Sequence, residues 1–280
     1  MSQQKLAIVT GGNKGIGFAI VQGLCKKFQG IVYLTSRDEK LGKEAVDKLK
    51  ELGLNPRFHQ LNIDDPKSVE TFKNYVKTNY GGVDILINNA GIAFKGASTE
   101  PFGVQAEVTI KTNYYGTLRM SEAFLPLLKN GAQLIQMSSS AGHLFKVPSP
   151  ELRSKLSSDQ LTIENLSLLM EEFIRSAKSG NNVELGWGSS AYSISKVGVS
   201  ALARIQQRMV DALYPDKNIS VNSCHPGYVS TDMSSHKGPL TIEEGAVSAL
   251  YLALAPHGLK GKYIWSDCAV IEWTAPNAPY

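Results

Sequence analysis

The sequence predicts an α/β fold, a doubly wound parallel sheet with helices on both of its faces. Short apolar runs of strand length alternate with longer segments of helical periodicity along almost the whole chain. Such alternation builds a parallel sheet through right-handed crossovers. The chain has 280 residues, 42% of them hydrophobic, which is enough for one large core. We therefore expect residues 1–280 to form a single domain.

Each strand is expected where a short apolar or β-branched run ends in polar or glycine residues. These runs place strands at 6–9, 31–34, 58–61, 84–87, 134–137, 220–224 and 263–265. Helices are expected where apolar residues recur every three or four positions, at 15–28, 39–52, 67–79, 103–128, 190–214 and 241–254. Gly53 closes the second helix, and Pro126 is expected to bend the fourth near its end.

The segment 141–189 breaks this alternation. A short connection is expected between the strand at 134–137 and the helix at 190–214, but a further helical pattern lies between them. Thr162 suits the N-cap of that helix and Gly180 its end. Its apolar stripe consists of Leu166, Leu169, Met170, Phe173, Ile174 and Ala177. We expect an inserted helix packed on the body of the protein, with a lid over the site as the competing role.

Composition excludes several classes of protein. The net charge is +4 with scattered Lys and Arg, which argues against nucleic-acid binding and suits a small anionic ligand. The cysteines, at 25, 224 and 268, are too widely spaced for a disulfide framework or a zinc site, so no metal is expected. Residues 1–5 show no signal peptide, and no apolar run of about 18 residues occurs. We expect a cytoplasmic protein with no membrane contact.

A glycine-rich motif follows the first strand and opens the first helix. It runs from Thr10 to Gly17, with glycines at 11, 15 and 17. A tight turn here lets the backbone approach a pyrophosphate, and the helix N-terminus then presents free N–H groups to the anion. A purely structural turn explains many glycine triplets. In a strand–turn–helix setting, however, the motif predicts a Rossmann-type dinucleotide site.

The end of the second strand indicates which dinucleotide binds. A site for NAD places an acidic residue at this strand tip, to bind the ribose 2′-hydroxyl. Here the tip carries Arg37, and Asp38 follows one step later. Arg37 and Lys14 could both reach a 2′-phosphate. The pair favours NADPH over the alternative of two solvated cations.

Two motifs could carry acid–base chemistry. Tyr192 and Lys196 lie four residues apart, on one face of the helix 190–214. A nearby ammonium lowers the pKa of a phenol, although the pair could equally be an ordinary exposed one. Ser138–Ser140 follow the strand 134–137, and a hydroxyl there could donate to a substrate carbonyl, although a simple serine-rich turn is the alternative.

Two asparagine positions are also unusual. The run Asn88–Gly91 follows the strand 84–87 and could form a wall of the cofactor site. Asn113 stands in the middle of a long helical pattern, where Asn is a poor helix former, so a polar role is indicated.

Taken together, these motifs resemble the short-chain dehydrogenase/reductase family. The glycine turn, Asn88–Gly91, Ser139 and Tyr192-x-x-x-Lys196 occur in its order and spacing, and the resemblance covers residues 5–265. Within the family, the runs 9–17, 88–95 and 186–192 resemble the NADPH carbonyl reductases of animals. The long segment between Ser139 and Tyr192 does so too. In those enzymes, and in some related plant reductases, an extra helical segment covers the oligomerisation face, so the resemblance implies a monomer.

The resemblance implies a mechanism and a set of catalytic residues. NADPH would reduce a small-molecule ketone, aldehyde or quinone, and Tyr192 would donate the proton. Lys196 would lower the pKa of Tyr192 and hold the nicotinamide ribose. Ser139 would orient the carbonyl oxygen, and Asn113 would support a water chain to Lys196.

The resemblance also implies the residues that bind cofactor and substrate. The cofactor residues are Gly11, Asn13, Lys14, Gly15, Ile16, Gly17, Arg37, Asn62, Ile63, Asn89, Gly91, Tyr192, Lys196, Pro226, Gly227, Val229 and Thr231. The substrate residues are Phe94, Lys95, Gln105, Ser139 and Tyr228.

Three positions depart from the pattern of the family. Asn62 stands where the family often has an Asp against the adenine. His225 and Tyr228 stand where the carbonyl reductases often have Cys and Trp. The last two put the binding of glutathione conjugates in doubt. Two other functions stay open: a biosynthetic ketone reductase of narrow specificity, and an NADPH-binding regulator without turnover.

Overall fold

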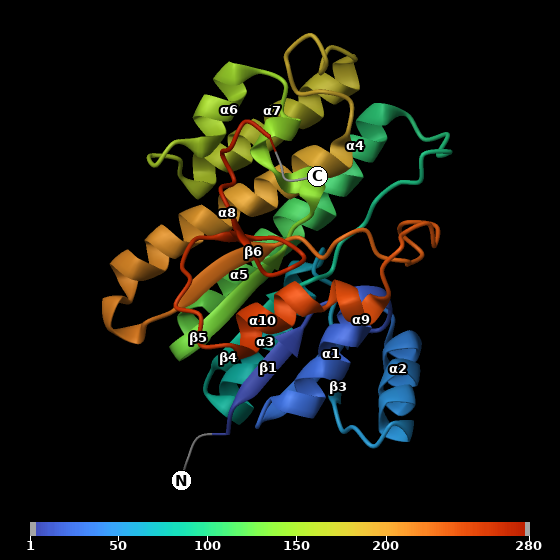
Figure 1. Ribbon diagram of the computed structural model, residues 1–280, viewed down its shortest axis with the longest axis vertical. Coiled ribbons are helices and arrows are strands. Elements are labelled where there is room, and N and C mark those ends of the chain that lie inside the picture. The colour runs from blue at the N-terminus through green and yellow to red at the C-terminus, as the bar shows by residue number, and fades with distance from the viewer. Residues whose placement is uncertain (1–3, 278–280) are drawn as a thin grey trace.

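The computed structural model describes residues 4–277. Residues 1–3 and 278–280 lie outside the described residues. They include both ends of the expected domain and part of the segment 1–5, which is expected to carry no signal peptide. One sheet of eight strands runs through the molecule in the order β3-β2-β1-β4-β5-β6-β7-β8 (Figure 1). The strands are β1 (Leu6–Val9), β2 (Ile31–Ser36), β3 (Arg57–Gln60), β4 (Val83–Asn88), β5 (Leu128–Met137), β6 (Ser220–Cys224), β7 (Tyr263–Ile264) and β8 (Val270–Ile271). All pairings are parallel except that of β8 with β7, which is antiparallel.

The predicted α/β class is confirmed, with helices on both faces of the sheet. The helices α1 (Gly15–Lys27), α2 (Glu39–Glu51), α9 (Ile242–Gly245) and α10 (Val247–Leu254) cover one face. The helices α3 (Pro66–Tyr80), α5 (Thr117–Phe124) and α8 (Ala191–Leu213) cover the other. Each face of the sheet packs against its helices in a separate hydrophobic core, and alternate residues of β1 point into the two cores. A central parallel strand is therefore buried on both faces and is apolar along its whole length.

The topology fixes where a ligand can bind. β1 pairs with β2 on one side and with β4 on the other, so the chain reverses its direction of winding there. Ligands of doubly wound sheets bind at such a switch point, beyond the carboxyl ends of the strands. The glycine turn after β1 and the turn after β4 meet at this place.

The long helix expected at 103–128 is wrong in its detail. The segment consists of α4 (Phe102–Ile110), a π-helical turn η1 (Lys111–Gly116), α5, and a 3₁₀ turn η2 (Leu125–Leu127). Pro126 ends the helix instead of bending it, since it has no N–H and disfavours helix before it. β5 therefore starts at Leu128 rather than at 134. Its first half bulges away from the ladder, because the register shifts between the β4 residues Val83 and Ile85.

The insertion forms two helices, α6 (Pro150–Ser157) and α7 (Ile163–Ser179), at the end of the molecule far from the N-terminus (Figure 1). The expected caps of α7 are confirmed. The Thr162 side chain accepts the N–H of Asn165, and Gly180 adopts a left-handed φ of 76°. The apolar stripe of α7 lies in a third core with residues of α4 and α8. The helix α6 and the short strand β8 were not predicted.

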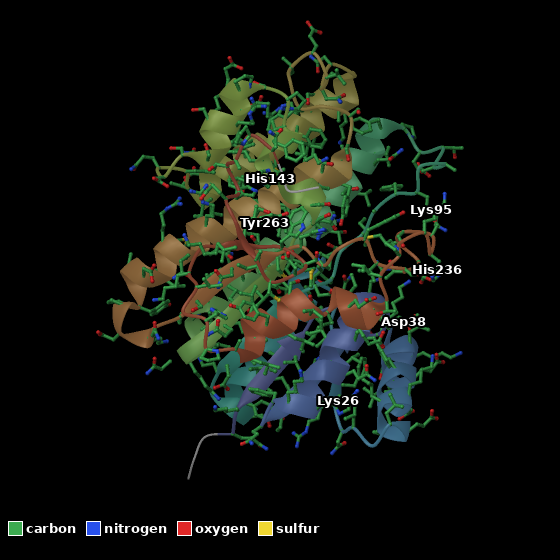
Figure 2. The ribbon with its side chains drawn as sticks, viewed as in Figure 1. Lys26, Asp38, Lys95, His143, His236 and Tyr263 are labelled. Carbon is green, nitrogen blue, oxygen red and sulfur yellow. The ribbon has the colours of Figure 1, made fainter. Side chains whose placement is uncertain are left out.

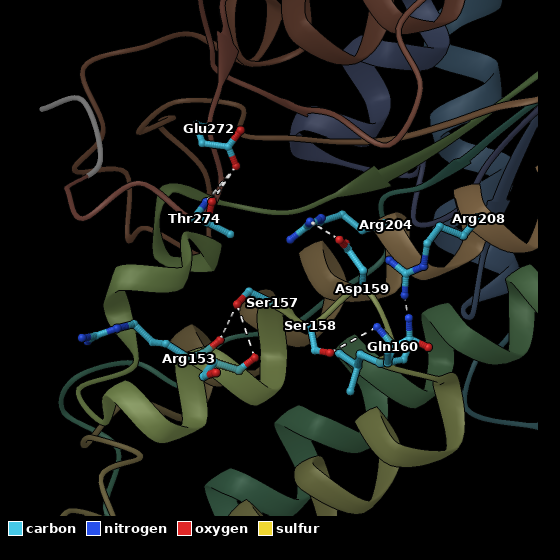
Figure 3. A network of polar contacts seen from close by, with 11 residues as sticks. Arg153, Ser157, Ser158, Asp159, Gln160, Arg204, Arg208, Glu272 and Thr274 are labelled. Carbon is cyan, nitrogen blue, oxygen red and sulfur yellow. Dashed lines mark hydrogen bonds and ion pairs between the residues drawn. The ribbon is translucent and has the colours of Figure 1, made fainter.

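Side chains of α8 fasten the turn between the inserted helices (Figure 3). Nη2 of Arg208 donates to the carbonyl of Leu161 at 2.7 Å, and Nη2 of Arg204 lies 3.7 Å from the carboxylate of Asp159. Three short 3₁₀ turns complete the chain, η3 (Ser140–Gly142), η4 (Leu144–Lys146) and η5 (Pro215–Lys217). Within residues 4–277, no helix combines the length and apolar character needed to cross a membrane.

Candidate active site

The glycine turn has the geometry of a close backbone approach. Gly11 and Gly15 adopt left-handed φ values of 64° and 56°, which disfavour other residues. A Cβ on Gly17 would lie 2.3 Å from the carbonyl oxygen of Gly11, so a side chain cannot fit there. The turn brings the start of α1 directly beneath the carboxyl end of β1.

The N-terminus of α1 is left free to bind an anion. Lys14 occupies the N-cap without a side-chain cap bond, and the first turn carries no acidic residue. By contrast, Asp38, Asp65 and Ser190 cap α2, α3 and α8 with their side chains. The free N–H groups of α1 therefore fit a dinucleotide phosphate.

The loop after β6 forms the opposite wall. The methyl group of Thr231 lies 3.4 Å from the place that a Cβ of Gly15 would occupy. Gly227 has a left-handed φ of 86°, and Val229 is buried and bridges to Leu240. Thr231 thus contacts the glycine turn, and Val229 meets Ile16 at Gly245.

Arg37 and Lys14 are the two cations expected to bind a 2′-phosphate. Arg37 follows β2 and is exposed. The carboxylate of Asp38 accepts the N–H of Leu41 at 2.9 Å, so it caps α2. Nζ of Lys14 lies 2.7 Å from the carboxylate of Asp232, and His236 approaches the same carboxylate at 3.2 Å. This pairing with Asp232 was not foreseen, because the residues are distant in the sequence.

The turn after β4 is braced by its own polar groups. Nδ2 of Asn89 donates to the carbonyls of Thr10 at 2.9 Å and Gly11 at 3.2 Å. Its amide hydrogens are therefore used to join β4 to the glycine turn.

The segment after β3 carries two further residues of the predicted cofactor site, Asn62 and Ile63. Oδ1 of Asn62 accepts the N–H of Asp64 at 3.1 Å. Ile63 is buried, and a Cβ on Gly116 would lie 2.8 Å from it.

The three serines after β5 have different surroundings. Oγ of Ser138 is buried 2.7 Å from Oγ of Ser200, which indicates a structural role. Ser139 caps η3, with its Oγ accepting the N–H of Ala141 at 3.2 Å. Its side chain also lies close enough to Tyr192 to oppose, in part, the rise in the pKa of that residue. Ser139 is thus the serine that meets the catalytic candidate on α8.

Tyr192 and Lys196 share one face of α8, and Nζ of Lys196 lies 5.8 Å from the centre of the Tyr192 ring. Burial raises the pKa of Tyr192 above its ordinary value, and the opposing effect of the Ser139 side chain is smaller. The lowering by Lys196 that the sequence suggested is not seen here. The ammonium instead turns to the carbonyl of Met137, to which it donates at 2.7 Å.

Lys196 is almost fully buried, and burial lowers its pKa to about 8. Within residues 4–277, the carbonyl of Met137 is the acceptor found for its three N–H donors. A Cβ on Gly91 would lie 3.5 Å from Nζ, and 3.1 Å from Oδ1 of Asn113. Gly91 therefore keeps open the space between these two side chains.

Asn113 lies in the π-helical turn, a local form that is frequent at functional sites. Its Oδ1 accepts the N–H of Ile92 at 2.8 Å, and its Nδ2 donates to the carbonyl of Ile92 and to Oγ of Ser195, both at 2.9 Å. Ser195 in turn donates to the carbonyl of Tyr192 at 2.7 Å. Asn113 thus ties the turn after β4 to the start of α8. The linking role of Ser195 was missed, since a serine within a helix gives no distinctive signal.

The residues expected at the substrate cleft are more scattered. Tyr228 is 55% exposed, Lys95 is exposed, and Phe94 is half-buried. Figure 2 shows Lys95 and His236 on loops at the right of the view. Nε2 of Gln105 donates to the carbonyl of Glu100 at 2.8 Å, so it supports the start of α4. Of this set, Ser139 is the residue whose side chain influences the pKa of Tyr192.

A model of the short chain dehydrogenase family matches residues 5–151, more than half of the chain. The chain belongs to this family. Carbonyl reductase (NADPH) 1 of Rattus norvegicus is 46% identical over 263 residues, which cover 94% of this chain and 95% of the rat protein. The structure of salutaridine reductase from Papaver somniferum is 32% identical with a TM-score of 0.84, covering 95% and 100% of the two chains. The NADPH-bound carbonyl reductase from chicken fatty liver is 25% identical with a TM-score of 0.69, covering 98% and 100%.

One residue at the family site departs clearly from the carbonyl reductase pattern. His225, in place of the frequent cysteine, is 7% exposed and stacks 4.4 Å from the ring of Trp265. Burial lowers the pKa of His225 to about 4, so its ring is neutral near pH 7. These contacts indicate that His225 is a packing residue.

Proposed function

We propose that this short chain dehydrogenase is an NADPH-dependent carbonyl reductase. It reduces ketones, aldehydes or quinones, with Tyr192 as the proton donor. The observation that carries the proposal is that Ser139, Tyr192 and Lys196 lie together past the end of β5, in a sheet whose first strand leads to the free N-terminus of α1. The names of the mammalian and avian relatives support it.

NADPH would supply the hydride, and the protein supplies the proton and the orientation. A raised pKa keeps Tyr192 protonated at neutral pH, the form from which it can donate to a developing alkoxide. Ser139, whose side chain lies near Tyr192, would hold the same carbonyl oxygen. Lys196 keeps free N–H donors for the nicotinamide ribose. Asn113 fixes the turn after β4, and both hydrogens of its side-chain amide are already used in hydrogen bonds. A water chain to Lys196 would therefore pass beside Gly91, which faces both Asn113 and Lys196.

The cofactor would lie along the cleft between α1 and the loop after β6. Gly11, Asn13, Gly15, Ile16 and Gly17 would pass their backbone beneath the pyrophosphate. Lys14 and Arg37 would take the 2′-phosphate. Asn62 would offer its Nδ2 to the adenine beside Ile63, and Asn89 and Gly91 would line the ribose side. Pro226, Gly227, Val229 and Thr231 would border the nicotinamide.

The substrate would enter between the loops that carry Phe94, Lys95 and Tyr228, beside Gln105 of α4. Tyr228 and Phe94 offer aromatic surface at the mouth, which suits an apolar carbonyl compound. A small-molecule carbonyl is the partner that this site requires.

A second candidate is a biosynthetic reductase acting on one ketone. The TM-score of 0.84 to salutaridine reductase favours it, because that plant enzyme matches the backbone closely. A broad range of accepted carbonyl compounds would argue against it.

We further propose a single-domain, monomeric, cytoplasmic enzyme. The helix α7 covers α4 and α8, the surface through which related enzymes associate. Light scattering after size exclusion would test the monomer, and a molar mass of twice the chain would contradict it.

The proposed activity is tested by following NADPH absorbance with menadione and with an aromatic aldehyde. Wild type should turn over and should prefer NADPH to NADH. Tyr192→Phe should lose about 10²-fold or more of kcat, because it has lost the general acid. If wild type binds NADPH but reduces neither compound, a wider panel of ketones separates narrow specificity from a protein without turnover.

A further inference from the structure

The peptide group that follows Ser139 is held at both of its ends. Its carbonyl oxygen, that of Ser139, accepts a hydrogen bond from the hydroxyl of Tyr263 at 2.5 Å. Its N–H, that of Ser140, donates to Nδ1 of His225 at 2.8 Å. Two side chains from outside the serine loop thus fix one peptide plane.

Both side chains stand on the sheet. Tyr263 lies in β7 and is 3% exposed, and His225 follows β6 with its own N–H bonded to the carbonyl of Ile264 at 2.8 Å. Trp265 packs against both rings, at 4.4 Å from His225 and 6.2 Å from Tyr263. Figure 2 shows Tyr263 and His143 together near the centre of the molecule, with ring centres 5.9 Å apart. The supports are therefore rigid.

The protonation states of these groups suit this arrangement. Burial raises the pKa of Tyr263, so its hydroxyl keeps the proton that it donates. Burial lowers the pKa of His225, so Nδ1 keeps the lone pair that accepts the N–H of Ser140. The same Nδ1 also accepts the N–H of Gly227 at 3.3 Å, which joins the serine loop to the loop beside the proposed nicotinamide site.

We propose that Tyr263 and His225 are positioning residues that clamp the Ser139–Ser140 peptide and so aim the hydroxyl of Ser139 at Tyr192. On its other side, Ser139 follows a fixed residue, since Ser138 N–H donates to the carbonyl of Cys224 at 2.8 Å. The peptide after Ser139 is thus held at both of its ends, and the peptide before Ser138 is held to β6. The bond from the N–H of Ala141 to Oγ of Ser139 then sets the direction of the Ser139 side chain. Catalytic groups need such support, because small displacements cost large factors in rate. The catalytic consequence of the clamp rests on the proposed function.

The test removes the hydrogen bond of Tyr263 or that of His225, first in the wild-type protein and then in the Ser139→Ala variant. Tyr263→Phe deletes the hydroxyl and keeps the ring. His225→Leu deletes the acceptor, whereas His225→Asn offers an amide oxygen in place of Nδ1. Tyr263→Phe and His225→Leu should each lower kcat about tenfold, while the affinity for NADPH stays unchanged. His225→Asn should keep most of the activity.

The decisive comparison is made in the Ser139→Ala background. If the clamp acts through Ser139, Tyr263→Phe should cause no further loss there. Equal losses in both backgrounds, or equal activity of His225→Asn and His225→Leu, would overturn the proposal. Tyr33→Phe is the matched control, because it also removes a buried phenol hydroxyl, one bonded to two other tyrosines. It should leave kcat unchanged.

A second readout does not need turnover. Exchange of the Ser140 amide hydrogen, followed by NMR, should quicken about tenfold in His225→Leu and stay slow in His225→Asn. Unchanged exchange in His225→Leu would overturn the clamp itself. If wild type reduces no carbonyl compound while exchange responds as expected, the proposed function fails and the clamp stands.

Discussion

The free energy of unfolding should fall at acid pH because His225 is buried as a neutral ring. The size of this loss follows from how far burial lowers the pKa of His225. The pKa of His225 is lowered from 6.5 to about 4 in the folded protein, whereas the unfolded chain keeps the ordinary value. Between these values the unfolded state binds a proton that the folded state does not, so stability is fully present above pH 6.5 and is lost as the pH falls toward 4. The pKa difference corresponds to about 3 kcal/mol.

His225→Asn isolates this contribution, because asparagine does not titrate and keeps an acceptor for Ser140. Urea unfolding would be followed at several pH values from 7 to 4 for both proteins. The stability of wild type relative to the variant should fall by about 3 kcal/mol over this range, since the carboxylates titrate alike in both. A difference that stays constant with pH would show that His225 is charged or solvated in the folded state, and would refute the reasoning.

Three further predictions concern the cofactor cleft. Asp232→Asn should tighten NADPH binding about two- to fivefold at low salt and leave NADH unaffected, since it frees Lys14 from an exposed ion pair; fluorescence titration measures this, and equal effects on both cofactors would contradict it. Gly17→Ala should cost about 3 kcal/mol in denaturant unfolding and abolish NADPH binding, because its Cβ would overlap the carbonyl of Gly11. Lys196→Met should stop turnover yet raise stability at pH 7 by about 1–2 kcal/mol, because burial disfavours the ammonium. The cost to wild type grows as the pH falls from the ordinary pKa of lysine to about 8, and it is complete below that value. A variant less stable than wild type at pH 7 in urea unfolding would refute the argument.

Much of the fold could be predicted, because local patterns determine it. The glycine turn, the apolar strands and the caps Thr162 and Gly180 are short-range signals, and the structure has them where expected. The π-helical turn at Asn113 could not be predicted, since one widened turn hardly changes the spacing of apolar residues. The early start of β5 was hidden by its bulge, whose residues are not strand-like.

The site was predictable in its members but not in its bonds. Tyr192, Lys196 and Ser139 could be chosen from motif order, yet the direction of the Lys196 ammonium toward Met137 depends on burial in three dimensions. The pairs Lys14–Asp232 and Tyr263–Ser139 join residues more than a hundred positions apart. No local pattern marks such a partner. By contrast, Ser149-Pro150-Glu151 is a helix-start signal that could have revealed α6.

The contacts of Trp273 determine when, during synthesis, the loop after β5 can reach its final structure. Nε1 of Trp273 donates to the carbonyl of Gly142 at 2.7 Å, and the carbonyl of Trp273 accepts the N–H of Leu144 at 3.3 Å. The loop that carries Ser139 therefore obtains contacts from residues translated far later. A nascent chain can build β1 to β5 while still attached to the ribosome, but it acquires these contacts only when Trp273 has left the exit tunnel. The contacts of the loop are thus complete only after the segment that contains Trp273 has been made.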